Sequence, residues 1–186
     1  MNTARIDNTL TRESISILAK ARGRKLLFWS GSEIADNVSY SLVGLHFSGF
    51  DCILRIQEPP IATFDTQDIY PMDVYEGDSR ILPSPSGEEI LPDGTRRPCL
   101  WHDFPVEKTV LEILVFSDDK TDGDWEVNGR DTAIDDACGI ALVFDDGCIL
   151  FEKTWIGTDF WTISRQKEVP PVLHDRSPEN IRVETL

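Results

Sequence analysis

Short runs of apolar residues, separated by glycine, proline and acidic residues, recur along most of the chain. Runs of about four to eight residues are typical of β-strands. One early stretch differs, because its apolar side chains recur three and four positions apart, as on one face of a helix. Thr11 suits the N-cap of that helix, and Gly23 suits the left-handed position that ends it. We therefore predict that the fold opens with a short helix within residues 8–23, followed by a buried strand over Lys25–Trp29.

A hairpin over Val38–Phe47 and Phe50–Gln57 shows the clearest register, with a turn at Ser48-Gly49. This register places three apolar pairs on one face: Phe47 with Phe50, Leu45 with Cys52, and Val43 with Leu54. The opposite face is more polar and pairs His46 with Asp51. A slip of one residue would turn every apolar side chain to the other face, so the pattern itself fixes the register.

Residues 58–107 have a different character, since eight of the eleven prolines lie there. Proline interrupts helices and central strands. Asp93-Gly94 predicts a small hairpin between residues 89–91 and 96–97. The remainder is compatible with a functional excursion over the surface and equally with a meander of short strands.

The main unit spans residues 108–164. Its first part, Val110–Phe116, is apolar on both sides and is predicted to be a central strand. An acidic loop over Ser117–Asp136 follows, and then a second hairpin over Gly139–Phe144 and Cys148–Trp155.

This second hairpin is expected to turn at Asp146-Gly147, a strong turn signal. Its register places Ile140, Leu142, Phe144, Ile149 and Phe151 on one face, and Ala141, Val143 and Leu150 on the other. A further strand is expected over Phe160–Ile163, and the tail over residues 166–186 is expected to be irregular and partly mobile. Together these elements predict one α+β domain over residues 1–186, a predominantly antiparallel, curved β-sheet with a short N-terminal helix and long loops.

Charge is the unusual feature of the composition. The chain has 33 acidic and 18 basic residues, a net charge of −15, while residues 1–25 have six basic and two acidic residues, a balance of +4. The acidic body repels phosphate, so neither nucleic acid nor an anionic membrane is an expected partner. A basic protein is favoured instead. The basic N-terminal part is expected to dock on the chain's own acidic surface. Like charge opposes self-association, so we expect a monomer or a weak homodimer.

Cellular location is inferred from missing features. No stretch approaches the 18 or so apolar residues that cross a bilayer, and the first seven residues lack the apolar core of a signal peptide. The four cysteines are dispersed without a CxxC pair and are expected to be reduced thiols. We therefore expect a cytoplasmic protein.

Motifs of catalysis and cofactor binding are missing from the sequence. There is no phosphate-binding loop, no GxGxxG after a strand, no HExxH and no GxSxG. The acidic segment lacks the glutamate that completes an EF-hand. Ser30-Gly31-Ser32 is interpreted as a turn. We assign no catalytic residue, no metal ligand and no cofactor, and we expect a binding protein rather than an enzyme.

Two residue pairs leave some chemistry open. His46 and Asp51 could form a cross-strand contact, or Asp51 could orient His46 as a catalytic base whose nucleophile the sequence does not identify. Cys99 and His102 are close in sequence, although Cys–His nucleophile pairs usually come from distant segments.

The acidic segment also contains Trp125, between Asp124 and Glu126. An aromatic side chain surrounded by carboxylates is typical of a protein-binding hot spot. The predicted partner-binding residues are Asp118, Asp119, Asp122, Asp124, Trp125, Glu126, Asp135 and Asp136.

The unit Val110–Ser164 combines a strand, the acidic segment with Asp124-Trp125-Glu126, and the hairpin over Ile140–Gly147. In this order it resembles the strand-loop-hairpin units of small acidic immunity proteins, which neutralise bacterial polymorphic toxins. The resemblance covers about a third of the chain, is not a motif match, and transfers no site residue. It implies a tight complex with a cognate toxin domain, often a nuclease with a cationic cleft. Binding could occur at that cleft or away from it.

Two other functions remain open. A hydrolase could bind a divalent ion through the carboxylates of residues 118–136, which predicts that two or three of them converge on one pocket. A small-ligand-binding sheet could hold its ligand under residues 58–107, which predicts a closed apolar pocket of several hundred Å³.

Overall fold

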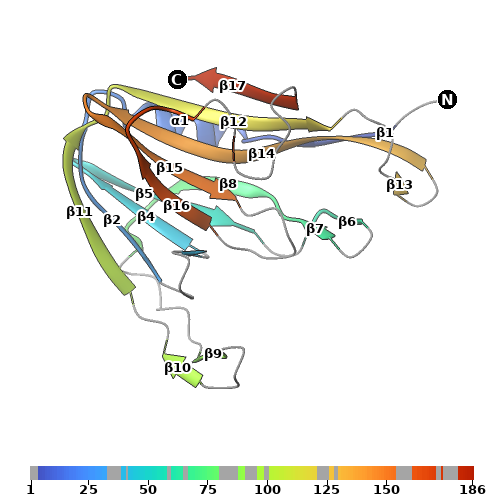
Figure 1. The fold of residues 1–186 in the computed structure, drawn as a ribbon, viewed down its shortest axis with the longest axis horizontal. Coiled ribbons are helices and arrows are strands. Elements are labelled where there is room, and N and C mark those ends of the chain that lie inside the picture. Colours follow the sequence, from blue (N-terminus) through green and yellow to red (C-terminus); the bar gives the residue numbers. More distant parts are fainter. Residues whose placement is uncertain are drawn as a thin grey trace.

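The computed structural model places the residues that it describes in two main β-sheets, two small hairpins and one helix (Figure 1). The residues that it describes are 4–32, 39–40, 42–57, 60–64, 67–79, 88–90, 96–98, 101–120, 126–127, 130–153, 161–170, 173 and 180–186. Within this part of the chain, no helix has the length and apolar character that crossing a membrane requires.

The larger sheet has the strand order β17-β12-β14-β15-β16-β3, and β1 and β13 pair with further parts of β14. β1 runs parallel to β14, whereas the other neighbours are antiparallel. The strands are β1 (Ala4–Asn8), β3 (Ser39–Tyr40), β12 (Glu112–Lys120), β13 (Glu126–Val127), β14 (Arg130–Phe144), β15 (Gly147–Lys153), β16 (Trp161–Gln166) and β17 (Ile181–Thr185).

The smaller sheet has the order β11-β2-β4-β5-β8 and is antiparallel throughout. Its strands are β2 (Lys25–Ser32), β4 (Leu42–Phe47), β5 (Phe50–Ile56), β8 (Met72–Glu76) and β11 (Trp101–Thr109). The small hairpins pair β6 (Ala62–Phe64) with β7 (Gln67–Ile69) and β9 (Glu88–Ile90) with β10 (Arg96–Pro98), and the helix is α1 (Arg12–Ala19). The prediction of a mainly antiparallel fold with one short helix is confirmed, although the strands form two sheets.

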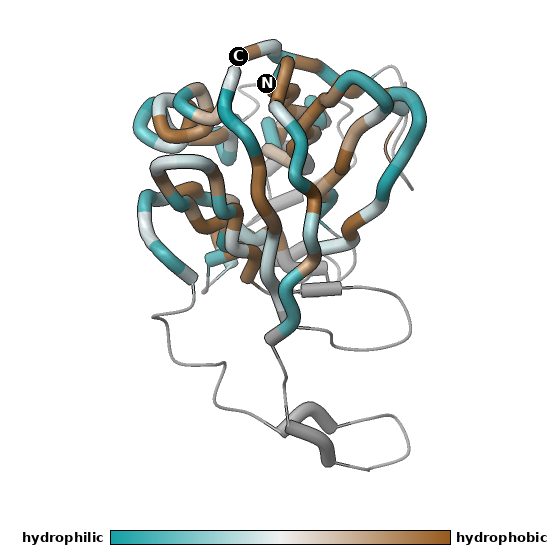
Figure 2. Tube along the Cα trace, turned by 90° about the vertical axis from the view of Figure 1, so that its left-hand side faces the viewer, coloured by the Kyte–Doolittle hydropathy of each residue, from teal (hydrophilic) through white to brown (hydrophobic). Residues whose placement is uncertain are grey.

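The main core lies between the two sheets. Trp29, Leu45 and Leu54 of the smaller sheet belong to the same buried cluster as Ile140 and Phe151 of the larger sheet. Apolar stretches follow the strands in the body of the fold, and the turns between them are mostly hydrophilic (Figure 2). The sheets therefore pack face to face, as two half-apolar layers must in order to remove their apolar faces from water.

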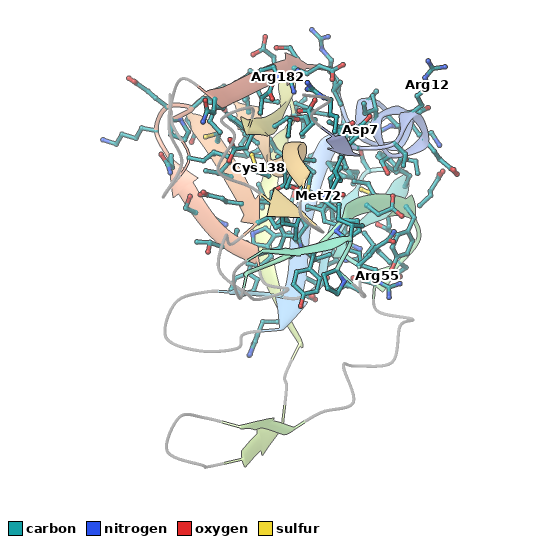
Figure 3. All side chains as sticks on the ribbon, turned by 90° about the vertical axis from the view of Figure 1, so that its right-hand side faces the viewer. Asp7, Arg12, Arg55, Met72, Cys138 and Arg182 are labelled. Atoms are coloured by element: carbon teal, nitrogen blue, oxygen red, sulfur yellow. The ribbon has the colours of Figure 1, made fainter. Side chains whose placement is uncertain are left out.

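A second apolar cluster covers the outer face of the larger sheet. It includes Phe116, Cys138 and Leu150, and Leu173 packs there from the segment after β16. Cys138 points into the body of the protein, whereas Arg12 and Arg55 extend from its surface (Figure 3). The larger sheet is thus apolar on both faces, which explains the continuous apolar pattern of β12.

The first hairpin has the predicted register. β4 and β5 pair Phe47 with Phe50, Leu45 with Cys52, and His46 with Asp51. The turn at Ser48-Gly49 is also as predicted, and Gly49 has a φ of 95°, a left-handed value that favours glycine.

The second hairpin turns at Asp145-Asp146, one position before the predicted turn, so that Phe144 pairs with Gly147. The predicted register would pair Leu142 with Phe151, whereas β14 and β15 pair Leu142 with Ile149. A displacement by two residues leaves every side chain on its predicted face. The division of apolar residues between the two faces is therefore confirmed by the two clusters.

The N-terminal region contains a strand that the sequence pattern does not predict. Thr11 is the N-cap of α1, as expected, and its side chain accepts a hydrogen bond from the Ser14 N–H at 3.1 Å. Gly23 has the expected left-handed φ, 77°. However, β1 precedes the helix. It pairs with β14 across about 130 residues of sequence, and no local pattern can show such a partner.

Three other predicted boundaries are wrong. The acidic stretch Ser117–Asp136 is largely strand, because β12 continues to Lys120 and β14 begins at Arg130. Ser30-Gly31-Ser32 continues β2 instead of forming a turn, since this stretch pairs with both β4 and β11. The tail beyond residue 166 is not wholly irregular, because β17 pairs with β12. In each case a partner strand from elsewhere overrides a weak local preference.

Within residues 58–107 the structure describes β6, β7, β8, β9 and β10, of three to five residues each, and most of β11. β9 and β10 pair Arg96 with Ile90 and Arg97 with Glu89, which confirms the predicted small hairpin; its turn at Asp93-Gly94 lies outside the described residues.

Helix α1 covers the open edge of the smaller sheet. The buried Ser14 hydroxyl accepts a hydrogen bond from the Val74 backbone N–H at 3.1 Å and donates to Asp73 Oδ1 at 2.5 Å. β8 is the edge strand, and its Val74 N–H also donates to Asp73 Oδ1 at 2.8 Å. Ser14 and Asp73 together therefore bond an N–H that a neighbouring strand would otherwise accept.

We predict that Ser14→Ala lowers the free energy of unfolding by about 1–3 kcal/mol, because it removes hydrogen bonds from buried backbone and side-chain groups. The control is Ser16→Ala, which makes the same change at an exposed position of the same helix. Urea denaturation of both variants measures the difference. Equal stability of the two variants would contradict a role of Ser14 at the sheet edge.

Candidate functional site

The described acids of the segment 118–136 lie on two neighbouring strands. β12 and β14 place Asp119 directly opposite Asp135, and Asp118 directly opposite Asp136. Like charges at opposing positions of a sheet destabilise it. The positions of nearby cations therefore decide what these carboxylates can do.

Asp135 binds two arginines from distant strands. Arg5 of β1 approaches Asp135 at 2.8 Å, and Arg182 of β17 pairs with the other carboxylate oxygen. The same two guanidinium groups lie 3.6 and 3.7 Å from Asp119. Burial by itself would raise the pKa of Asp135, but the hydrogen bonds and charges of Arg182 and Arg5 outweigh burial and lower the pKa below its ordinary value. The basic N-terminal region thus docks on the acidic surface, as predicted.

Asp136 lies in a buried polar network between the sheets. Its Oδ1 accepts hydrogen bonds from Lys153 Nζ at 2.5 Å and from the Asn8 side chain at 2.7 Å. Both donors also reach the backbone carbonyl of Tyr70, at 2.8 and 3.2 Å. A buried ion pair with all its remaining hydrogen bonds satisfied favours one unique arrangement of the segments that contribute to it. Asp136 therefore helps to position β1, β15 and the segment before β8.

The predicted partner-binding set is accordingly divided. Asp118 and Asp136 are buried, and Asp119 and Asp135 face Arg5 and Arg182 of the same chain. Glu126 belongs to β13, and its side chain lies outside the described part, as do Asp122, Asp124 and Trp125. Asp119, Asp135 and Asp136 thus pair with cations of the same chain. The prediction of a partner surface now rests on the residues of the set whose side chains lie outside the described part.

A second polar cluster lies on the outer face of the smaller sheet. His46 Nδ1 lies 3.1 Å from Asp51 Oδ1, and His46 Nε2 lies 3.0 Å from Ser30 Oγ and 3.2 Å from Ser79 Oγ. The two serine hydroxyls are 2.8 Å apart. Phe28 stacks on the imidazole with ring centroids 4.2 Å apart. The ring is therefore fixed in both position and plane.

The segment after β8 closes over this cluster. Gly77–Ser79 crosses the outer face of β4 so closely that a Cβ on Gly44 would lie 2.0 Å from Ser79 Oγ and 2.6 Å from Ser30 Oγ. Only glycine at position 44 leaves room for this approach. The same segment brings Asp78 Oδ1 to 4.0 Å from His46 Nδ1. We name His46, Asp51, Asp78, Ser30 and Ser79 the His46 cluster.

The Asp51–His46–Ser arrangement has the connectivity of a nucleophile, a base and an orienting carboxylate. However, Ser30 and Ser79 are 1 % and 0 % exposed, so neither hydroxyl is accessible to a substrate. The side chains of Asp51 and Asp78 are 29 % and 26 % exposed. Solvent therefore reaches the cluster on the carboxylate side of the ring.

Sequence reasoning finds part of this cluster. The hairpin register predicts the contact of His46 with Asp51, which the structure confirms. It misses Ser30, because the local pattern of that segment is interpreted as a turn. Asp78 and Ser79 lie in the proline-rich stretch, where no local pattern predicts a return to β4. Of the other proposed pair, His102 is exposed on β11, and Cys99 lies outside the described residues.

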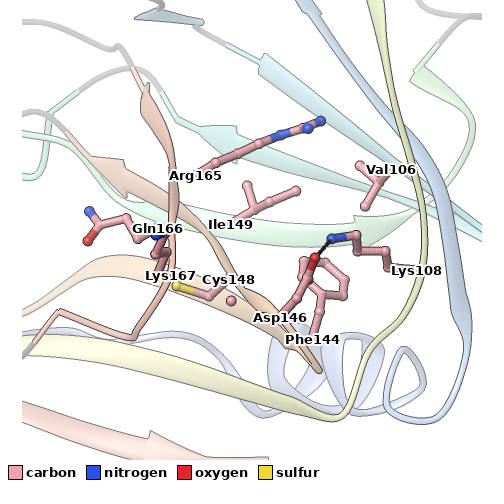
Figure 4. A pocket seen from close by; sticks show the side chains of 10 residues that line it. Val106, Lys108, Phe144, Asp146, Cys148, Ile149, Arg165, Gln166 and Lys167 are labelled. Carbon is pink, nitrogen blue, oxygen red and sulfur yellow. Dashed lines mark hydrogen bonds and ion pairs between the residues drawn. The ribbon is translucent and has the colours of Figure 1, made fainter.

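A small pocket lies between β11 and the β14–β15 turn, away from the His46 cluster (Figure 4). Its volume is about 260 Å³, and apolar Val106, Phe144 and Ile149 line it together with Arg165 and Lys167. Lys108 at its rim pairs with Asp146. The pocket is smaller than typical sites for drug-sized ligands, about 300–1,000 Å³, and it differs from the closed apolar pocket that a ligand-binding sheet predicts.

Comparisons with protein-family models, with curated proteins and with solved structures find no match to this chain. Any inference about its function therefore rests on the geometry of the two polar clusters and on the charge of the chain.

We predict that Gly44→Ala lowers the free energy of unfolding by about 1–3 kcal/mol, since its Cβ overpacks against both serines. Gly77→Ala is the matched control, because its Cβ would meet only Ile53 Cδ1, at an ordinary 3.6 Å. Urea denaturation compares the two. A Gly44→Ala variant as stable as Gly77→Ala would show that the segment over β4 does not require a glycine beneath it.

We also predict an acid-sensitive contribution from Asp135. The pKa of Asp135 in the folded protein is below its unfolded value, which is about 3.9. Above the unfolded pKa, the ionised carboxylate therefore stabilises the fold, and this stabilisation is lost as pH falls through the folded pKa. The wild type should exceed Asp135→Asn in unfolding free energy at neutral pH, and this difference should shrink below about pH 4. Denaturation at a series of pH values measures it, with Asp145→Asn at the exposed turn as control. A difference that grows toward acid pH would contradict the assignment.

Proposed function

We propose that this protein is an acidic protein-binding module whose partner is a basic protein, and that it acts as an immunity protein that neutralises a cognate bacterial toxin by forming a direct complex. The ratio of charges supports the proposal: with 33 acids and 18 bases, at least 15 acids have no base within the chain to pair with one to one. Such an excess creates a long-range field that attracts cations and repels phosphate.

Six of the bases whose side chains the structure describes pair with a carboxylate of the same chain. Lys20 pairs with Glu76, Lys25 with Glu107, and Lys108 with Asp146, in addition to the arginine and lysine pairs of β14. Pairs at an exposed surface add little stability. Their relevance here is that each cation already faces a carboxylate, so these positions do not form a basic patch for nucleic acid.

The segment between β12 and β14 is the proposed contact region. Asp135 and Asp136 of β14 and Asp119 of β12, the strands on either side of it, all pair with cations from other strands. In sequence, that segment contains Asp122, Asp124 and Trp125, two carboxylates beside an aromatic side chain. A large apolar ring supplies binding energy at an interface, whereas surrounding charges set the association rate and the choice of partner.

The hydrolase alternative receives less support from the described residues. Its proposed ligands include Asp118, Asp119, Asp135 and Asp136, three of which are buried. Arg5, Arg182 and Lys153 supply positive charge where a divalent ion would be required. A metal ion in this place would have to displace those cations.

The first test is co-purification of the tagged protein from its native cells, with the product of the neighbouring gene co-expressed. A stoichiometric complex with a basic, toxic protein is expected. Recovery of the protein without a protein partner would contradict the proposal.

With that partner in hand, Asp122→Lys/Asp124→Lys should slow association by about tenfold or more and weaken its dependence on salt. Trp125→Ala should cost about 2 kcal/mol or more of binding free energy. The control is Asp103→Lys/Asp145→Lys, which changes the charge equally at two exposed positions outside the segment. Equal effects of the two double variants, measured by biolayer interferometry at several salt concentrations, would mean that the segment is not the interface.

A further inference from the structure

We propose that His46, Asp51 and Asp78 form a binding site for a divalent transition-metal ion of the Zn²⁺ class. The sequence pattern identifies no metal ligand, because Asp78 is distant in sequence and reaches the hairpin only through the segment that folds over β4. The site is separate from the proposed partner-binding segment and does not depend on it.

The distances fit a common metal ion. The candidate ligand atoms all lie within 4.8 Å of one another, and His46 Nδ1 lies 3.1 Å from Asp51 Oδ1 and 4.0 Å from Asp78 Oδ1. A tetrahedral ion with bonds of about 2.0–2.2 Å requires its ligand atoms about 3.4 Å apart. The two distances from His46 lie on either side of that value, and the third pair lies within 4.8 Å, so small side-chain shifts would complete the coordination.

The second shell is already suited to a metal on Nδ1. A metal ion bound at Nδ1 requires the proton to be on Nε2, where it must be donated to an acceptor. Ser30 Oγ and Ser79 Oγ occupy that position. Because a hydroxyl can donate or accept, the same serines serve the ring in either tautomer. The network therefore permits the imidazole to exchange its contact with Asp51 for a metal ion without losing a hydrogen bond at Nε2.

The direction of access also favours a metal ion over a catalytic serine. The serines are buried behind the ring, whereas the carboxylates at its Nδ1 edge are partly exposed. An ion that enters from solvent would meet two negative charges first and the imidazole next. Phe28 holds the ring plane, so that the lone pair of Nδ1 would be directed at the ion.

The donor set selects the kind of ion. Imidazole together with carboxylates suits Zn²⁺ and its neighbours in the first transition series, whereas Mg²⁺ and Ca²⁺ prefer oxygen ligands alone. Three protein ligands would leave at least one coordination position to water. A bound ion would also link β4, β5 and the segment after β8, and would offset the charge of two neighbouring carboxylates.

The test is titration of the full-length, chelator-treated protein with Zn²⁺, followed by calorimetry, and with Co²⁺, followed by its visible absorption. One ion should bind per chain, with a Co²⁺ spectrum of nitrogen and oxygen ligands and no thiolate band. Asp78→Asn and Asp51→Asn should each weaken binding about tenfold or more, because a carboxylate ligand becomes a neutral amide. Asp103→Asn, an exposed acid of the same sheet, is the control and should leave the affinity unchanged.

Asparagine has the shape of aspartate and can still accept a hydrogen bond from His46, so the metal-free variants should fold; circular dichroism checks this. The proposal is overturned if the wild type binds no Zn²⁺ at micromolar concentrations. It is equally overturned if Asp78→Asn and Asp51→Asn bind as tightly as Asp103→Asn, or if the Co²⁺ spectrum shows thiolate ligands. Zn²⁺ should also raise the melting temperature of the wild type and the control more than that of either ligand variant.

Discussion

The electrostatic repulsion between facing aspartates of β12 and β14 is the constraint on which the larger sheet depends. Two acidic pairs stand directly opposite each other in this central ladder. A strand pair of this kind is unfavourable unless cations neutralise it. The chain supplies them from Arg5, Arg182 and Lys153, which belong to three other strands. The need for charge compensation therefore determines where β1, β17 and the end of β15 must lie.

How far the sequence predicts this structure depends on the range of the interactions. In both hairpins, the local alternation of apolar and polar residues and the turn residues predict which side chains lie on each face of the sheet. They also predict the contact between His46 and Asp51. The acidic stretch is predicted as a loop because many neighbouring acids disfavour a strand, and only cations distant in sequence reverse that preference. β1, β17 and the return of Ser79 to Ser30 share this property. Each is specified by a partner far along the chain, which no local pattern contains.

The two polar clusters differ in how their charge is satisfied. Around Asp135 and Asp136, arginine and lysine side chains supply positive charge from within the chain. In the His46 cluster, two carboxylates share the single imidazole edge, and the residues behind it are neutral serines and Phe28. The first cluster organises the fold. The second places two carboxylates beside one imidazole at a position that solvent partly reaches, and the proposed metal site is built on this arrangement.

The two arginines of Asp135 also affect the order in which the chain can fold. Arg5 is separated from Asp135 by 130 residues and Arg182 by 47, so the two ion pairs of Asp135 close two long loops. Contacts of such long range slow folding, because the entropy of loop closure is lost before the contact is gained. When β14 leaves the ribosome during synthesis, Arg5 has already been translated, whereas Arg182 has not. Until Arg182 emerges, β12 has an unpaired edge and Asp135 has half of its final counter-charge. Over this interval the nascent chain is more exposed to strand-edge aggregation than the folded protein.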